Sequence, residues 1–174
     1  MNEVIKAMHE RRSERAFNGK AVPDALVDEI IEAGLYAANG RGTQCPVVVV
    51  VNDDETKAKL SDLNRRIGGW PEGFDPFYNA ACYLWVLAPK DNPTYIYDGS
   101  LVMGNLMLAA HSLGVSSIWI HRAKEESECE EGRAILDGYG VPGGYVGIGH
   151  CAIGYSDGEP KEAAPRKEGR VFKK

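Results

Sequence analysis

The chain has 174 residues, of which 44% are apolar, and this is enough material for one domain with a single core. Its four cysteines form no Cys-x-x-Cys pair and have no histidine at metal-ligand spacing, which argues against a disulfide framework and a zinc site. The net charge is −5, yet residues 1–20 hold five of the 20 Lys and Arg, and residues 166–174 hold another five. Nucleic-acid-binding proteins usually carry a basic face across the whole domain. Basic ends instead favour a small anion, such as a phosphate-bearing cofactor, or two solvated tails.

The hydrophobic periodicity predicts a chain of helices and strands. Apolar residues recur at helical spacing near the N-terminus, as at Val4, Ile5 and Met8. The valine run 47–51 is too apolar for a half-exposed strand, which predicts a strand at the centre of a covered sheet. The stretch 68–79, rich in Gly, Pro and aromatic residues, predicts a loop of the kind that often lines a site. The expected elements, in chain order, are helices over 2–12 and 24–38, a strand over 47–51, a helix over 55–66, a strand over 82–87, a helix over 98–113, a strand over 116–121, a helix over 125–137 and a strand over 145–155.

Two helices before the first strand favour an α+β domain, spanning residues 1–174, over a doubly wound fold. The helix over 98–113 is apolar nearly all round, so a second copy of the chain is expected to cover one of its faces. Residues 99–120 carry no charge, but Asn105 and His111 favour a buried helix, a turn and a strand over a membrane span. The N-terminus is charged where a signal peptide needs an apolar stretch, so a cytoplasmic location is expected.

Three guanidinium groups and a hydroxyl stand at the end of the first predicted helix, in the run Arg11-Arg12-Ser13-Glu14-Arg15. Guanidinium groups match phosphate oxygens in pairs and stay charged at any working pH, so the run is a candidate phosphate site. The same cations could instead stabilise the C-terminus of the helix through its dipole. The run alone leaves both interpretations open.

Two further motifs give weaker signals. Residues 39–46 form a Gly-rich turn whose side-chain amides could meet the polar edge of a heterocycle, or an ordinary connection. Residues 147–152 fit Gly-x-Gly-x-x-Ala, but the strand continues and no helix opens there, so a dinucleotide fingerprint is rejected. No nucleophile elbow is present and the histidines show no ligand spacing, so no metal is expected.

Three blocks, in their order and spacing, resemble the nitroreductase family and in particular its short bacterial branch. The first block holds Arg11, Arg12, Ser13, Arg15 and Phe17, the second is 39–46 with the valine strand, and the third runs from Asp98 to Arg122. The resemblance covers almost the whole chain. It implies an α/β/α sandwich with a mixed central sheet, in an intertwined homodimer that holds FMN at two interface sites.

The resemblance also implies roles for particular residues. The FMN phosphate would be held by Arg11, Arg12, Ser13 and Arg15 together with Arg166 and Lys167 of the C-terminal tail. The polar edge of the flavin would meet Thr43 and Gln44. The loop Trp119-Ile120-His121-Arg122, above all Trp119, Ile120 and His121, would place backbone groups beside the reactive N5. One position departs from the pattern, because many relatives have Asn where this chain has Gly42.

The implied activity is electron transfer from NADH or NADPH, through FMN, to a small organic acceptor such as a nitroaromatic or a quinone. The absence of a catalytic side-chain constellation is consistent with this, because the cofactor carries the chemistry. Two alternatives remain at this stage. One is a flavin-binding store or sensor without turnover, and the other is a structural domain without a cofactor. The role of residues 70–78 stays undetermined, although their aromatic rings could wall an acceptor pocket.

Overall fold

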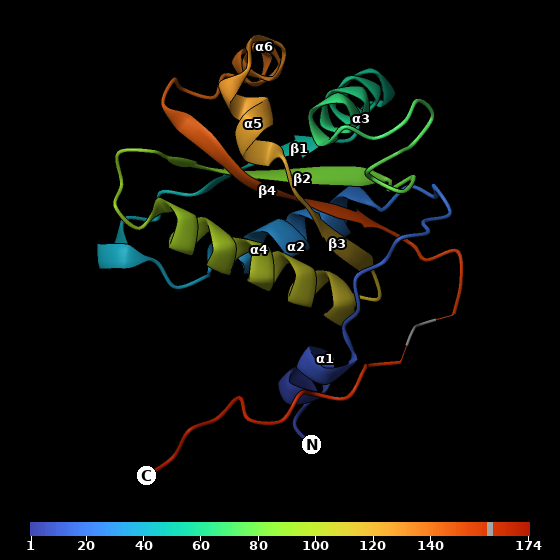
Figure 1. Ribbon diagram of the computed structural model, residues 1–174, viewed down its shortest axis with the longest axis vertical. Coiled ribbons are helices and arrows are strands. Elements are labelled where there is room, and N and C mark those ends of the chain that lie inside the picture. The colour runs from blue at the N-terminus through green and yellow to red at the C-terminus, as the bar shows by residue number, and fades with distance from the viewer. Residues whose placement is uncertain (160–161) are drawn as a thin grey trace.

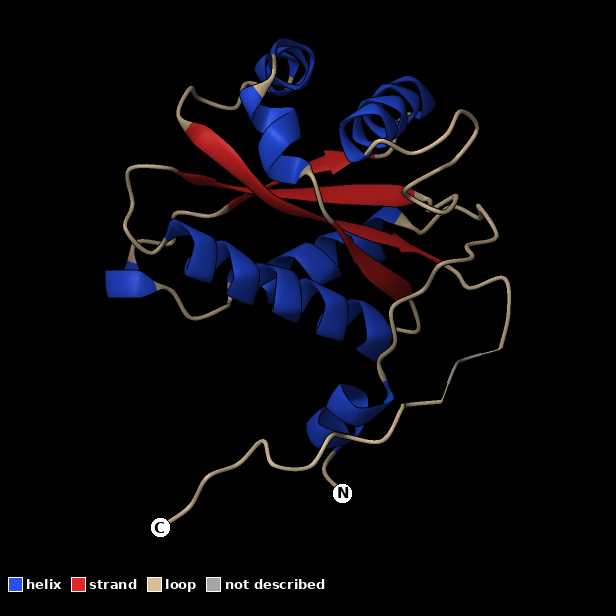
Figure 2. Cartoon of the chain, viewed as in Figure 1, coloured by secondary structure: helices blue, strands red, loops and turns tan. Residues whose placement is uncertain are grey.

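The structure, a computed structural model that describes residues 1–159 and 162–174, consists of a four-stranded sheet between two layers of helices (Figure 1). The sheet order is β1-β2-β4-β3, with β1 Val47–Val51, β2 Cys82–Pro89, β4 Tyr145–Gly154 and β3 Ser116–Ile120. Helices α2 (Asp24–Leu35) and α4 (Tyr95–Ser112) cover one face. Helices α3 (Asp54–Gly68), α5 (Ala123–Glu128) and α6 (Glu130–Gly138) cover the other (Figure 2). The expected α+β class and the helix, sheet, helix layering are confirmed.

The pairing of the strands differs from the expected mixed sheet. All three pairings between the named strands are antiparallel. Because Val51, at the end of β1, pairs with Tyr83, near the start of β2, the connection through α3 starts and ends at the same end of the sheet. Parallel pairing in the described residues is limited to an isolated bridge between Ser13 and Ser117.

The two strands at the centre of the sheet are β2 and β4, and β2 shows the alternation of its side chains clearly. Its residues 82–88 are buried and alternate between two clusters, with Trp85 facing α3 and Leu84 facing α2 and α4. The valine strand β1 lies at the edge, so the prediction that it is central is wrong. Helices cover both faces of the sheet even at this edge, which explains why every residue of β1 is apolar. Only Val49 and Val51 of this strand are buried.

Local signals explain where several helices begin and end. The Asp53 side chain caps α3 by accepting a hydrogen bond from the Thr56 backbone at 2.8 Å, and this bond lowers the pKa of Asp53. The single helix expected over 125–137 is two helices, because Cys129 adopts an extended backbone between them. At Gly132, a Cβ atom would lie 2.0 Å from the carbonyl oxygen of Glu126, so only glycine permits this close approach.

Two helices leave apolar side chains exposed. Helix α1 (Glu3–Glu10) has no buried residue and projects away from the layers. Helix α4 buries one side against α2 and the sheet, while Ile96, Tyr97 and Leu101 on its other side are exposed. None of the helices in the described part of the chain combines the length and apolar character that a membrane span requires. All four cysteines are free, and burial raises the pKa of Cys82 and of Cys151 to about 12, so both thiols stay protonated at neutral pH.

Candidate functional site

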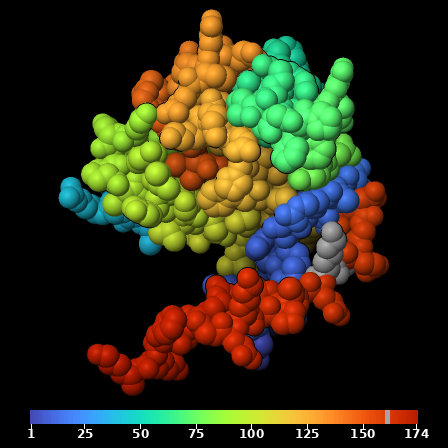
Figure 3. Space-filling model, viewed as in Figure 1, coloured from blue at the N-terminus to red at the C-terminus, as the bar shows by residue number. Residues whose placement is uncertain are grey.

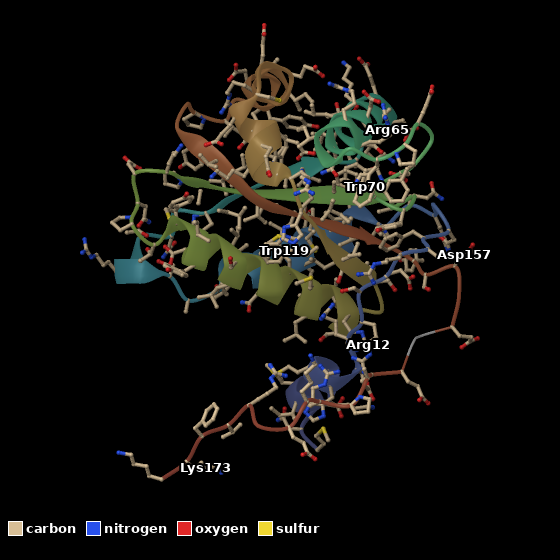
Figure 4. The ribbon with its side chains drawn as sticks, viewed as in Figure 1. Arg12, Arg65, Trp70, Trp119, Asp157 and Lys173 are labelled. Carbon is tan, nitrogen blue, oxygen red and sulfur yellow. The ribbon has the colours of Figure 1, made fainter. Side chains whose placement is uncertain are left out.

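The arginine run lies in a hollow at the end of α1, here called the arginine hollow. Helix α1 ends at Glu10, and the chain then runs beside β3, where the Glu14 backbone donates to Ser117 at 3.1 Å. The hollow has a volume of about 220 Å³. It is lined by Glu10, Arg11, Arg12, Ser13, Glu14, Arg15, Ala16, His111, Val115, Ser116, Ser117, Ser156, Gly158 and Glu159. Figure 4 shows Arg12 between α1 and the layered body of the molecule.

The arginine side chains contain buried donors that have no partner. Arg12 Nη1 donates to the His9 carbonyl at 2.8 Å, so part of this side chain does cap the helix. However, Arg12 Nε and Arg11 Nη1 are buried, and neither has a hydrogen-bond partner among the described residues. A buried guanidinium donor without a partner is costly, and an anion offsets that cost. These unpartnered donors therefore fit a phosphate group. A purely helix-capping role of the arginines would not explain them.

A second hollow, here called the aromatic hollow, adjoins the first. Its volume is about 250 Å³, and Arg15 lines both hollows. It is lined by Arg15, Asn64, Trp70, Phe74, Pro76, Tyr78, Ile118, Trp119, Ile120, His121 and Arg122. The structure thus brings the predicted residues Trp119, Ile120 and His121 close to the predicted phosphate site.

The loop with Thr43 and Gln44 lies elsewhere. The turn η1 (Gly40–Gly42) is the cyan segment at the left edge of Figure 1, well apart from α1. The Gly40 backbone donates to the buried Asp98 carboxylate at 2.9 Å, and the Gln44 backbone donates to Asn39 Oδ1 at 2.9 Å. Thr43 and Gln44 are exposed and line two other hollows. A single chain therefore does not bring them to the arginine hollow.

The tail residues Arg166 and Lys167 are also exposed. The Arg166 guanidinium donates to the Ala164 carbonyl at 2.7 Å. In the residues that the structure describes, no hydrogen bond or ion pair joins either side chain to the arginine hollow. The tail, red in Figure 3, extends below the body of the molecule, and Figure 1 shows α1 at the same end. The predicted contribution of these two cations to the phosphate site stays a prediction.

A buried polar network behind the aromatic hollow was missed by the sequence reasoning. Asn64 Nδ2 donates to the His121 carbonyl at 2.7 Å and to Glu126 Oε1 at 2.7 Å. The other oxygen of Glu126 contacts His150 Nε2, and all three side chains are at most 2% exposed. The network fixes the backbone after β3, because it joins α3, α5 and β4 at that point. The sequence did not single out any of these three residues, because the contacts between them form only in the folded chain.

The Gly-x-Gly motif in β4 serves packing. A Cβ atom at Gly149 would lie 2.6 Å from the indole nitrogen of Trp119, and one at Gly147 would lie 2.0 Å from the Ala123 carbonyl oxygen. The two glycines therefore make room for Trp119 and for the start of α5. Because they lie inside a strand, the rejection of a dinucleotide fingerprint is confirmed. The described residues contain no group of three or more potential metal ligands.

Comparisons with known proteins agree with this architecture. The model of the nitroreductase family matches residues 8–67. A solved nitroreductase with bound FMN from Bacteroides fragilis NCTC 9343 has a TM-score of 0.88 and 29% identity, over 99% of this chain and 98% of its own. An FMN-dependent nitroreductase from Clostridium difficile R20291 has a TM-score of 0.79 and 30% identity, over 97% of each chain. A curated relative from Archaeoglobus fulgidus, which carries a provisional NADH dehydrogenase/NAD(P)H nitroreductase name, is 27% identical over 91% of this chain and 88% of its own.

The similarities to the two solved structures extend over nearly the whole length of both chains, and the match to the family model includes the arginine run. The chain belongs to the nitroreductase family.

The buried network gives a testable prediction. Replacing Glu126→Leu leaves Asn64 and His150 without their buried partner, so we expect a loss of about 3–5 kcal/mol in the free energy of unfolding. Chemical denaturation measures this loss. The matched control is Glu128→Leu on the same helix, which removes only an exposed ion pair with Lys90 and should shift the unfolding midpoint little. Equal midpoints for the two variants would contradict the assigned network.

Proposed function

We propose that this protein is an FMN-dependent oxidoreductase that passes electrons from NADH or NADPH to a small organic acceptor such as a nitroaromatic or a quinone. The observation that carries the proposal is the pair of buried, unpartnered guanidinium atoms on Arg11 and Arg12. Both arginines line the arginine hollow, where the family resemblance expects the FMN phosphate, and an anion there would satisfy donors that have no protein partner. The FMN named in the two solved relatives supports the choice of cofactor.

The residues of the arginine hollow would hold the phosphate. Arg11, Arg12 and Arg15 would donate from their guanidinium groups, and Ser13 from its hydroxyl. When bound, FMN supplies a ring that accepts a hydride from the nicotinamide and passes electrons to the acceptor. The chain would orient that ring through the backbone of residues 119–121, which Asn64 holds at the His121 carbonyl. It would also exclude water with the rings that line the aromatic hollow.

We propose further that the active form is a homodimer. A site that includes Thr43 and Gln44 needs a second chain, since one chain keeps this loop away from the arginine hollow. The exposed apolar residues of α1 and α4 provide a surface that a partner would cover. Phe172 of the tail is 92% exposed, and docking it on the partner would order the segment that contains Arg166 and Lys167. We also propose a cytoplasmic location, where reduced nicotinamide cofactors are available.

The first test separates an enzyme from a flavin store or sensor. We expect the purified protein to be yellow, and its bound flavin to lose absorbance near 450 nm when mixed with NADH or NADPH and to regain it with a quinone. Stopped-flow absorbance follows both phases. A flavin that stays oxidised with excess NADH and NADPH would favour the store or sensor. A colourless protein that takes up no FMN would contradict both the enzyme and the store or sensor.

The second test concerns the phosphate. In the double variant Arg11→Ala/Arg166→Ala, we expect FMN to bind at least about a hundredfold more weakly, because two charge-assisted contacts are lost. Fluorescence titration with FMN measures this change. The matched control is Lys59→Ala/Lys173→Ala, which also removes one helix cation and one tail cation but leaves the arginine hollow intact. Unchanged FMN affinity in the first double variant, with the dimer retained, would show that the basic ends are ordinary surface.

A further inference from the structure

We propose that the aromatic hollow binds planar aromatic acceptors that carry an acidic group, and that Arg122 is the residue that selects for the negative charge. This inference rests on the proposed function, because it specifies the acceptor at the same site. Three properties of the hollow carry it. These are an aromatic wall, a fixed loop behind that wall, and a cation that is weakly paired.

The wall consists of three rings from the loop after α3. The ring centroids of Trp70 and Phe74 are 5.3 Å apart, and those of Phe74 and Tyr78 are 6.1 Å apart in an edge arrangement. Trp70 is 47% exposed, so its ring faces the hollow and solvent and is not part of the core. Figure 4 shows Trp70 and Arg65 beside α3. Such a surface favours flat, apolar ligands, because rings stack on it at little entropic cost.

The loop that carries the wall is fixed before any ligand arrives. The Asp75 carboxylate accepts hydrogen bonds from Ser61 Oγ at 2.8 Å and from the Phe77 backbone at 2.9 Å. It also accepts from the Asn79 backbone at 2.6 Å. These bonds hold Tyr78 and Asn79 in left-handed conformations, with φ angles of 55° and 63°. A wall that is ordered in advance loses less entropy on binding a ligand.

The charge of the lining is positive. Arg15, His121 and Arg122 line the hollow, and no Asp or Glu is among its lining residues. Arg15 also lines the arginine hollow, where it would face the phosphate. Arg122 is therefore the guanidinium that remains for a second anionic group. Its contact with Glu125 is long, at 3.9 Å, whereas Arg65 pairs with Asp62 at 2.7 Å.

The backbone of Arg122 supplies an independent argument. Its φ angle is 80°, a left-handed conformation that favours glycine, yet the residue carries a long cationic side chain. The conformation is held by hydrogen bonds on both sides, from Asn64 to the His121 carbonyl at 2.7 Å and from the Glu126 backbone to the Arg122 carbonyl at 2.9 Å. An arginine at a backbone position that favours glycine is consistent with a use for the guanidinium group.

The test uses the full chain loaded with FMN and two pairs of probes. Benzoate and benzamide measure binding through quenching of tryptophan fluorescence, and 4-nitrobenzoate and 4-nitrobenzamide measure kcat/KM with NADH and with NADPH. We expect the acid of each pair to be preferred by about tenfold, as for one charge-assisted hydrogen bond. In Arg122→Gln this preference should fall to near unity, whereas Arg122→Lys should restore part of it. The matched control is Lys124→Gln, a neighbouring cation that does not line the hollow.

Each other outcome overturns the inference. An equal affinity for acid and amide in the wild type, with flavin that is bound and reduced normally, would refute the acidic acceptor and leave the proposed function intact. A rise in KM for NADH or NADPH in Arg122→Gln, without a change in acid preference, would assign Arg122 to the reductant. If the protein takes up no FMN, the proposed function fails, and the inference fails with it.

Discussion

The proposed phosphate site depends on two guanidinium nitrogens, Arg11 Nη1 and Arg12 Nε, that are buried and have no protein partner among the described residues. Arg11 and Arg12 are drawn against the body of the molecule because the segment after α1 pairs with β3 through Ser13 and Ser117. That pairing buries donor atoms that the described residues leave unpaired. An unpaired buried donor costs its desolvation free energy, and a ligand that accepts its hydrogen bond would remove that cost. The arginine hollow is thus the candidate binding site for the phosphate.

The remainder of the fold positions the surroundings of that hollow. Close approach at Gly147 and Gly149 lets α5 and Trp119 pack directly on β4, which fixes the end of β3. The network of Asn64, Glu126 and His150 then sets the backbone after β3 from the core side. These buried contacts lie next to an open, aromatic hollow. A rigid backbone on one side and an exposed wall on the other suit a preorganised site that is open to a ligand.

Much of the fold was predictable from the sequence, for physical reasons that are local. The apolar runs at 82–87 and 116–121 mark strands, and Asp53 marks the start of α3, since both signals act over a few residues. The order of strands in the sheet was not predictable from such signals. The valine run predicted a central strand, because apolar residues on both faces are typical of one. The strand lies at the edge, where helices still cover both faces of the sheet. The break at Cys129, where the backbone is extended between α5 and α6, was not indicated by the hydrophobic pattern, which continues through it.

The site was predictable to a similar extent. The residue types and the family resemblance predicted Arg11, Arg12, Ser13 and Arg15 as a phosphate site, and the structure places all four in one hollow. The buried network and the proximity of Arg122 to the aromatic wall, by contrast, depend on tertiary contacts. The most direct measurement of the central claim is a crystal structure grown with FMN. We predict that the phosphate lies within hydrogen-bond distance of Arg11 and Ser13, with the tail of one chain ordered beside it. A structure in which the phosphate binds elsewhere, or in which the arginine hollow holds no ligand at saturating FMN, would contradict the account.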